Sequence, residues 1–184
     1  MPQEVAASNL HLQPGVTIKV VGEIPSDAKE LKLNLGKDHI NLGLHMHVRF
    51  NYGDDNEEVI YSTRLEGFFG NEQKETHFPF VTGSRVEVSI TFDGRHFTMR
   101  LPDGFQSNFP NFFNLNEINF FEVLGDFKMP GEPTLTRRDY ALPSTWSPAP
   151  SREYLILFHS KGSFPLAPTI SRPLAPIPSP KGQF

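Results

Sequence analysis

The chain has 184 residues, a formal net charge of −4 and no cysteine. The length suits one domain with a sizeable core plus an extension, and the mild acidity argues against a nucleic-acid-binding surface, which needs clustered basic residues. Without cysteine, disulfides, thiolate metal ligands and a cysteine nucleophile are excluded. The sequence begins with no secretory signal pattern and has no apolar run of membrane-spanning length, so we expect neither a signal peptide nor membrane insertion.

The first half of the chain reads as short strands separated by turns. Residues 1–9 carry no clear pattern and are expected to be loose. Apolar residues then recur at every second position over 16–20, 29–35 and 40–51, which is typical of strands with one face in a core. Residues 59–63 are a short β-branched and aromatic segment, which also predicts a strand. Glycine, proline and aspartate between these segments predict the turns.

The segment from Ile40 to Asn51 is the longest alternating pattern in the chain. Its even positions are apolar and are expected to face the core throughout. Its odd positions include His45, His47 and Arg49, which follow one another on the opposite face at a spacing of roughly 6.5–7 Å. These groups offer directional hydrogen bonds to ligand oxygens. We expect them to face open solvent as a ligand site; a polar face satisfied by cross-strand partners is the alternative.

The second half of the chain continues the strand pattern. Alternation returns over 85–92 and 97–101, and Asp93-Gly94 predicts a tight hairpin between these two segments. Residues 118–123 are a further candidate strand. Helical periodicity is not evident anywhere, and the 17 phenylalanines suit packing between sheets. Many short strands with turn signals between them predict an all-β sandwich or barrel.

The composition changes after Met129. Eleven of the 17 prolines lie in residues 130–184, and proline removes the backbone donors that a sheet needs. We therefore expect a domain over residues 5–129 and a Pro-rich tail over 130–184 that is largely disordered. The apolar segment from Glu153 to Phe158 is the exception, since it is strand-prone and suited either to pairing with a sheet edge or to aggregation.

Residues 5–129 resemble the galectins, a family of β-galactoside-binding lectins, and specifically the short single-domain type. The resemblance covers about two-thirds of the chain without large gaps. The segments that carry it are 33–38 (LNLGKD), 44–45 (LH) followed by 49–51 (RFN), 70–73 (GNEQ), 78–80 (FPF), 101–104 (LPDG), 109–111 (FPN) and 125–128 (GDFK). The resemblance implies a two-sheet antiparallel jelly-roll sandwich.

The resemblance also implies a sugar site that is partly substituted in this chain. His45, Arg49 and Glu72 match the family pattern. The other four positions differ: the family has Asn at His47 and at Ser62, Trp at Phe69 and Arg at Lys74. The implied carbohydrate-binding residues are therefore His45, His47, Arg49, Ser62, Phe69, Glu72 and Lys74.

The implied function is a β-galactoside-binding lectin with weakened or altered specificity for cell-surface or matrix glycoconjugates, without a cofactor. The implied localisation is cytoplasmic and extracellular, through secretion without a signal peptide. Relatives of this type dimerise through their terminal strands. In this chain the family pattern stops at Lys128-Met129, where its final strand should begin, so a homodimer is doubtful and the final strand is missing or replaced.

The sequence leaves other functions open. A lectin-inactive galectin-like module that binds proteins is the main alternative. A glycoside hydrolase needs two carboxylates across a cleft, and Glu72 has only Glu66 and Glu75 near it in sequence. His45, His47 and Glu72 are a weak metal pattern. The acidic run 54–58 lacks the ligand spacing of a calcium loop and is expected to be a solvated charge cluster.

Overall fold

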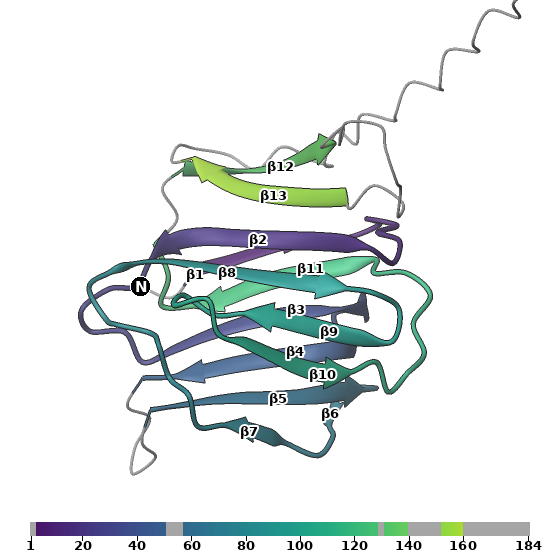
Figure 1. The fold of residues 1–184 in the computed structure, drawn as a ribbon, viewed down its shortest axis with the longest axis horizontal. Coiled ribbons are helices and arrows are strands. Elements are labelled where there is room, and N and C mark those ends of the chain that lie inside the picture. The colour runs from purple at the N-terminus through teal and green to yellow at the C-terminus, as the bar shows by residue number, and fades with distance from the viewer. Residues whose placement is uncertain (1–2, 51–56, 129–130, 140–151, 160–184) are drawn as a thin grey trace, which may run out of the picture.

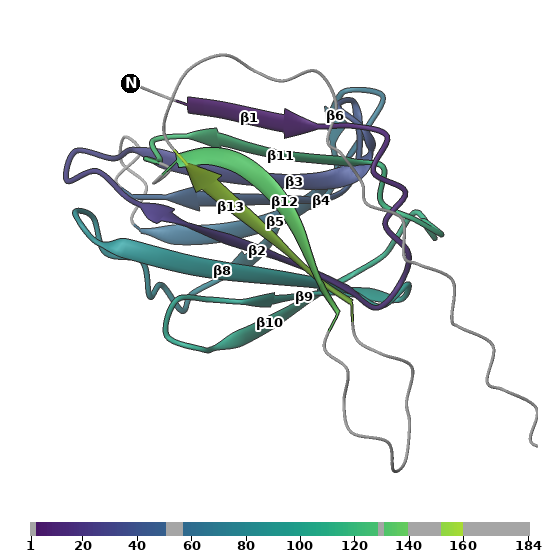
Figure 2. The same cartoon turned by 90° about the horizontal axis from the view of Figure 1, so that it is seen from above.

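The computed structural model describes residues 3–50, 57–128, 131–139 and 152–159 (Figure 1). In these residues the chain forms thirteen strands and no helix, and hence no helix that is able to cross a membrane. The strands build two sheets that face each other, and Figure 2 shows the two layers from above. The predicted all-β sandwich is confirmed.

The first sheet has seven strands, all paired antiparallel. From one edge to the other, it consists of β1 (Gln3–Ala7), β11 (Phe120–Gly125), β3 (Glu30–Asp38), β4 (Asn41–Arg49), β5 (Glu58–Leu65) and β6 (Phe68–Phe69), with β7 (Gln73–Glu75) also paired to β5. The strand predicted over 40–51 is therefore at the centre of this sheet.

The second sheet has six strands, of which β13 is parallel to its neighbour β2. Its order is β10 (Gln106–Pro110), β9 (His96–Arg100), β8 (Arg85–Phe92), β2 (Val16–Glu23), β13 (Arg152–His159) and β12 (Gly131–Asp139). The segment predicted as strand-prone lies in β13, where Arg152 to Ile156 pair with Val16 to Val20. In Figure 1 the β12–β13 hairpin continues this sheet beyond β2. The rest of the Pro-rich tail, whose disorder was predicted, lies outside the described residues.

The core lies between the sheets and is rich in phenylalanine. Phe92 and Phe97 stack with ring centroids 5.1 Å apart across the predicted Asp93-Gly94 hairpin. The largest fully buried side chains include Tyr61, Phe92, Phe97, Phe109, Phe121 and Phe127. Burying a side chain of this size stabilises a fold by about 1.5–3 kcal/mol, so these rings hold the two layers together.

The alternation in β4 breaks near its start, which differs from the prediction. Ile40 precedes the strand and is 39% exposed, and Leu42 is buried but lies outside the core cluster. An irregularity in the pairing between Leu42 and His45 changes the face on which side chains lie. Consequently Gly43 packs towards the core, where a Cβ would collide with Leu115. Core-facing alternation is regular only from Leu44 onwards.

The sequence pattern missed several strands. Residues 3–7 were expected to be loose, yet they form β1 against β11. The short strands β6 and β7, together with β10 and β12, also lack a long alternating pattern. Pairing with a neighbouring strand stabilises such segments regardless of their own sequence preference.

Gly22 in β2 provides a stability test. A Cβ at this position would collide with the fully buried ring of Phe127. Gly22→Ala is therefore expected to lower the free energy of unfolding by about 1–3 kcal/mol, the usual cost of overpacking. Urea unfolding followed by fluorescence measures this. The neighbouring exposed Glu23→Ala serves as control, and equal stability of the two variants would contradict the packing described.

Candidate functional site

The polar side chains of β4 lie on the outer face of the seven-stranded sheet, away from the core. His45 is opposite Asn34 on β3 and Ser62 on β5. Two positions further along, His47 is flanked by the same two strands, and Arg49 follows it. The register therefore places the three predicted side chains on one face.

This face is less open than the sequence predicted. His45 is only 7% exposed and His47 only 9%, because polar side chains of the neighbouring strands and the ring of Phe69 surround them. The expectation of imidazoles facing open solvent was wrong. Cross-strand partners, which were the alternative, orient both rings.

Asn34 fixes the orientation and protonation of His45. The Asn34 amide nitrogen donates to Glu122 over 2.7 Å, which leaves its carbonyl oxygen to accept from His45 Nδ1, also at 2.7 Å. Burial, together with the positive charge that His47 carries when protonated, lowers the pKa of His45 to about 3. His45 is therefore neutral at pH 7 and presents Nε2 as a hydrogen-bond acceptor.

His47 is bound to a carboxylate on β3. Its Nε2 lies 2.9 Å from Glu30 Oε2, and the other Glu30 oxygen lies 2.7 Å from Lys32 Nζ. Burial lowers the pKa of His47, with Lys32 adding to the effect, although Glu30 opposes it. Burial alone would raise the pKa of Glu30, but the bonds from Lys32 and His47 outweigh it and lower that pKa. The ring thus donates to Glu30 rather than to a ligand.

Arg49 and Lys74 share one carboxylate at the far end of the site. Arg49 Nη1 donates to Glu58 Oε1 over 3.0 Å, and Lys74 Nζ lies 3.1 Å from Glu58 Oε2. The side chains of Arg49 and Glu58 are about one-fifth exposed or less, whereas Lys74 is 58% exposed. Glu58 was predicted to belong to a solvated charge cluster; it instead begins β5 and ties together β4, β5 and β7.

Phe69 provides an exposed aromatic surface beside His45. The two ring centroids are 4.8 Å apart, and Phe69 is 57% exposed. Its strand partner Arg64 places its guanidinium carbon 5.2 Å from the ring centroid, which is a cation–π contact. Ser62 is buried opposite His45. The ring is therefore held in place while part of its surface remains free.

Glu72 is the least constrained of the predicted site residues. It directly precedes β7 and is exposed. Among the described residues it makes no hydrogen bond or ion pair that would occupy its carboxylate. The structure thus brings His45, His47, Arg49, Ser62, Phe69 and Lys74 onto β4 to β7 of one sheet, with Glu72 at its border.

Sequence reasoning missed the residues that hold the site together. These supporting residues are Glu30, Lys32, Asn34, Glu58, Arg64 and Glu122. Lys32 and Asn34 alternate with the apolar residues of 29–35, and this alternation was the one available signal. Their partners depend on strand register, which a sequence pattern does not specify.

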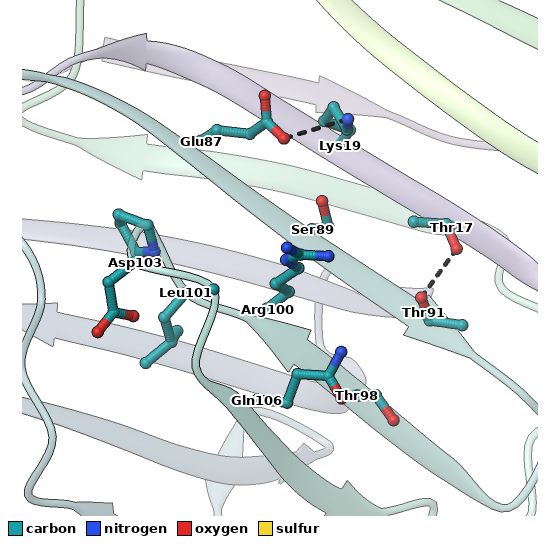
Figure 3. A pocket seen from close by; sticks show the side chains of 12 residues that line it. Thr17, Lys19, Glu87, Ser89, Thr91, Thr98, Arg100, Leu101, Asp103 and Gln106 are labelled. Atoms are coloured by element: carbon teal, nitrogen blue, oxygen red, sulfur yellow. Dashed lines mark hydrogen bonds and ion pairs between the residues drawn. The ribbon is translucent and has the colours of Figure 1, made fainter.

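A separate hollow lies on the outer face of the second sheet (Figure 3). It has a volume of about 680 Å³ and is lined by side chains such as Thr91, Arg100 and Gln106. Its Lys19 is paired with Glu87, and Thr17 with Thr91, as the dashed lines show. This composition is typical of a solvated strand face, so we do not place the functional site there.

The comparison with known proteins decides the family. Residues 4–131 match the family model described as galactoside-binding lectin. Galectin-1 of Mus musculus is 48% identical over 125 residues, which make up 68% of this chain and 93% of the mouse protein. The chain belongs to the galactoside-binding lectin family.

Other members of the family agree in sequence and in structure. The 16 kDa beta-galactoside-binding lectin of Gallus gallus is 36% identical over 70% of this chain and 96% of its own length. CG-16, a homodimeric agglutinin from chicken liver, has a TM-score of 0.66 at 36% identity, covering 68% of this chain and 95% of its own. Toad ovary galectin, solved in complex with thio-digalactose, has a TM-score of 0.64 at 32% identity over 68% of this chain and 94% of its own. The β12–β13 hairpin begins where the family match ends.

The described residues contain no group of three His, Asp or Glu side chains placed to hold a metal ion. His45 Nδ1 and His47 Nε2 both already bind protein oxygens. The metal pattern noted in the sequence therefore gains no support from the geometry.

The burial of His45 predicts how stability depends on pH. In the unfolded chain this imidazole takes up a proton near its ordinary pKa of 6.5, whereas in the folded protein it does so only at about 3. Its contribution to stability is therefore lost as the pH falls from 6.5, by up to about 1.4 kcal/mol per pH unit. In urea unfolding, the stability advantage of the wild type over His45→Gln is expected to shrink by about 1–2 kcal/mol between pH 6.5 and 5. The exposed His96→Gln is the control, and parallel pH curves for wild type and His45→Gln would contradict the assignment.

Proposed function

We propose that this protein is a β-galactoside-binding lectin with weakened or altered specificity, which binds glycoconjugates on the outer face of the seven-stranded sheet and has no enzymatic activity. The observation that carries the proposal is the exposed ring of Phe69 beside the neutral, oriented imidazole of His45. Family membership supports the choice of galactosides.

Each side chain has a defined role in this proposal. Phe69 stacks on the apolar C–H face of galactose. His45 Nε2 accepts a hydrogen bond from the axial 4-hydroxyl, and Arg49 donates to ligand oxygens. Glu72 accepts from a further hydroxyl. The 4-epimer, glucose, leaves the His45 acceptor unpaired, and an unpaired buried polar group is costly.

The substitutions relative to the family pattern weaken binding. Ser62 is shorter than the family's Asn, and Phe69 has less stacking area than Trp. The Nε2 of His47 is hydrogen-bonded to Glu30 and is therefore not available to a sugar. Each lost hydrogen bond costs about 0.5–1.5 kcal/mol, which is about twofold to tenfold in affinity. Water bridges recover part of this loss at Ser62.

Calorimetric titration with lactose and N-acetyllactosamine tests the proposal. We expect saturable binding that is weaker than that of a galectin with the full Asn and Trp set, and no binding of maltose, which lacks galactose. No heat at millimolar lactose with a folded protein would overturn the proposal in favour of the alternative function.

That alternative is a lectin-inactive module that binds proteins. The observation favouring it is the exposed cross-strand pair of Phe68 and Leu65, which are 80% and 54% exposed beside the site. Such apolar exposure suits a protein contact. A module of this kind would bind no lactose, either as the wild type or with Phe69 replaced.

We propose that the protein works both in the cytoplasm and outside the cell. A homodimer, as stated for the chicken agglutinin, would need an association other than through the edge of β2, because β13 occupies that edge. Sedimentation of the full chain at several concentrations tests this: a monomer throughout would exclude bivalent glycan cross-linking.

A further inference from the structure

The carboxylate of Glu58 is placed as a clamp on the two cations of the site. It begins β5 directly opposite Arg49 in the strand register. One of its oxygens accepts from Arg49, and the other pairs with Lys74 on β7. With both oxygens occupied by cations from different strands, its geometry is fixed from two sides.

The clamp also determines what remains available to a ligand. Glu58, which the resemblance did not assign to the site, holds Arg49 and Lys74. Glu72 is left exposed, with no hydrogen bond or ion pair to a described side chain. The site thus separates a carboxylate that positions cations from one that is free to accept hydroxyl groups.

The four charged side chains of this group that the structure describes carry two charges of each sign. Arg49 and Lys74 contribute two positive charges, and Glu58 and Glu72 contribute two negative ones. His45 is neutral because burial lowers its pKa to about 3, and Glu30 is paired with Lys32. The side chain of Glu58 is only 17% exposed. Solvent and salt therefore screen its charge less than they would screen a fully exposed charge.

We propose that Glu58 is a positioning residue that orients Arg49 and Lys74 and, by cancelling one of their charges, makes the site select neutral galactosides over anionic ones. This rests on the function proposed above and adds to it the class of ligand. Removing the charge of Glu58 while keeping its shape makes the surroundings of Arg49 and Lys74 more positive by one charge, which favours a sulfated galactoside.

The test compares Glu58→Gln with the wild type by titration with lactose and with 3′-sulfated lactose. We expect lactose binding to fall by about 5- to 20-fold, as for loss of a hydrogen bond to a charged group. Binding of 3′-sulfated lactose falls less, so the ratio of the two affinities rises at least about threefold, an electrostatic effect that weakens with added salt. A general structural defect would weaken both ligands equally and leave this ratio unchanged.

Two further variants keep the outcome clear. Glu57→Gln makes the same charge change at the exposed neighbouring residue and is expected to leave both affinities within about twofold, because exposed charges are screened. Glu58→Asp retains the charge but shortens the clamp, so lactose binding weakens at an unchanged ratio. If Glu58→Gln does not fold, Glu58→Thr removes the same charge with a strand-favouring side chain and replaces it. An unchanged ratio in Glu58→Gln, or equal effects of Glu57→Gln, would overturn the inference while the lectin function stands. A wild type that binds neither sugar overturns the proposed function itself.

Discussion

Replacing Arg49 by methionine is expected to weaken lactose binding by about 10- to 100-fold, since a hydrogen bond to a charged group is worth about 1.5–3 kcal/mol. Arg49 is a cationic donor of the site, on the same strand as His45, and Glu58 orients it. Methionine keeps the packing volume of the stem but donates nothing. Glu58 retains Lys74 as its partner, so the fold is expected to persist. Calorimetric titration measures the loss.

The matched control is Arg100→Met on the outer face of the second sheet. Arg100 lines the hollow shown in Figure 3. Its substitution removes the same charge from the opposite side of the protein. It is expected to leave lactose affinity unchanged. Equal losses in the two variants, or a loss only in Arg100→Met, would contradict sugar binding on the seven-stranded sheet.

A chain that ends at Lys128 is expected to lose about 2–4 kcal/mol of stability and to self-associate. It lacks the β12–β13 hairpin, which pairs with β2 from Val16 to Val20. Each lost backbone hydrogen bond contributes about 0.5–1.5 kcal/mol, and water replaces part of it. The exposed β2 edge then presents unpaired donors and acceptors to other chains. Thermal unfolding and sedimentation of the shortened protein measure both effects.

A chain that ends at His159 is the control, because it keeps β12 and β13 and removes only residues 160–184. It is expected to match the full chain in melting temperature and in size. If the chain ending at Lys128 also matches the full chain, the hairpin does not replace a final strand of the sheet.

The sequence pattern predicted the strands that have one apolar and one polar face. Segments such as 85–92 alternate cleanly, and the Asp93-Gly94 turn between β8 and β9 followed from its backbone preferences. β1 was missed, since its stability comes from pairing with β11. For β13, the apolar sequence indicated a strand but gave neither its partner nor its parallel direction.

Some residues of the candidate site were likewise predictable from the sequence, and others were not. The odd positions of β4 identified His45, His47 and Arg49, because side chains two apart share a face. The role of Glu58 was not predictable, since an acidic run ordinarily indicates a solvated loop. Only the register of β4 on β5 places this carboxylate beside Arg49. The deep burial of the two imidazoles likewise depends on side chains from β3 and β6 that are distant in sequence.

Titration of the ¹⁵N-labelled full chain with lactose, followed by amide chemical shifts, tests the central claim most directly. The account predicts saturable shifts concentrated at Arg49, Ser62, Phe69 and Glu72, on the outer face of the seven-stranded sheet. Shifts confined to Thr91, Arg100 and Gln106 around the other hollow, or no shifts at saturating sugar, would contradict it.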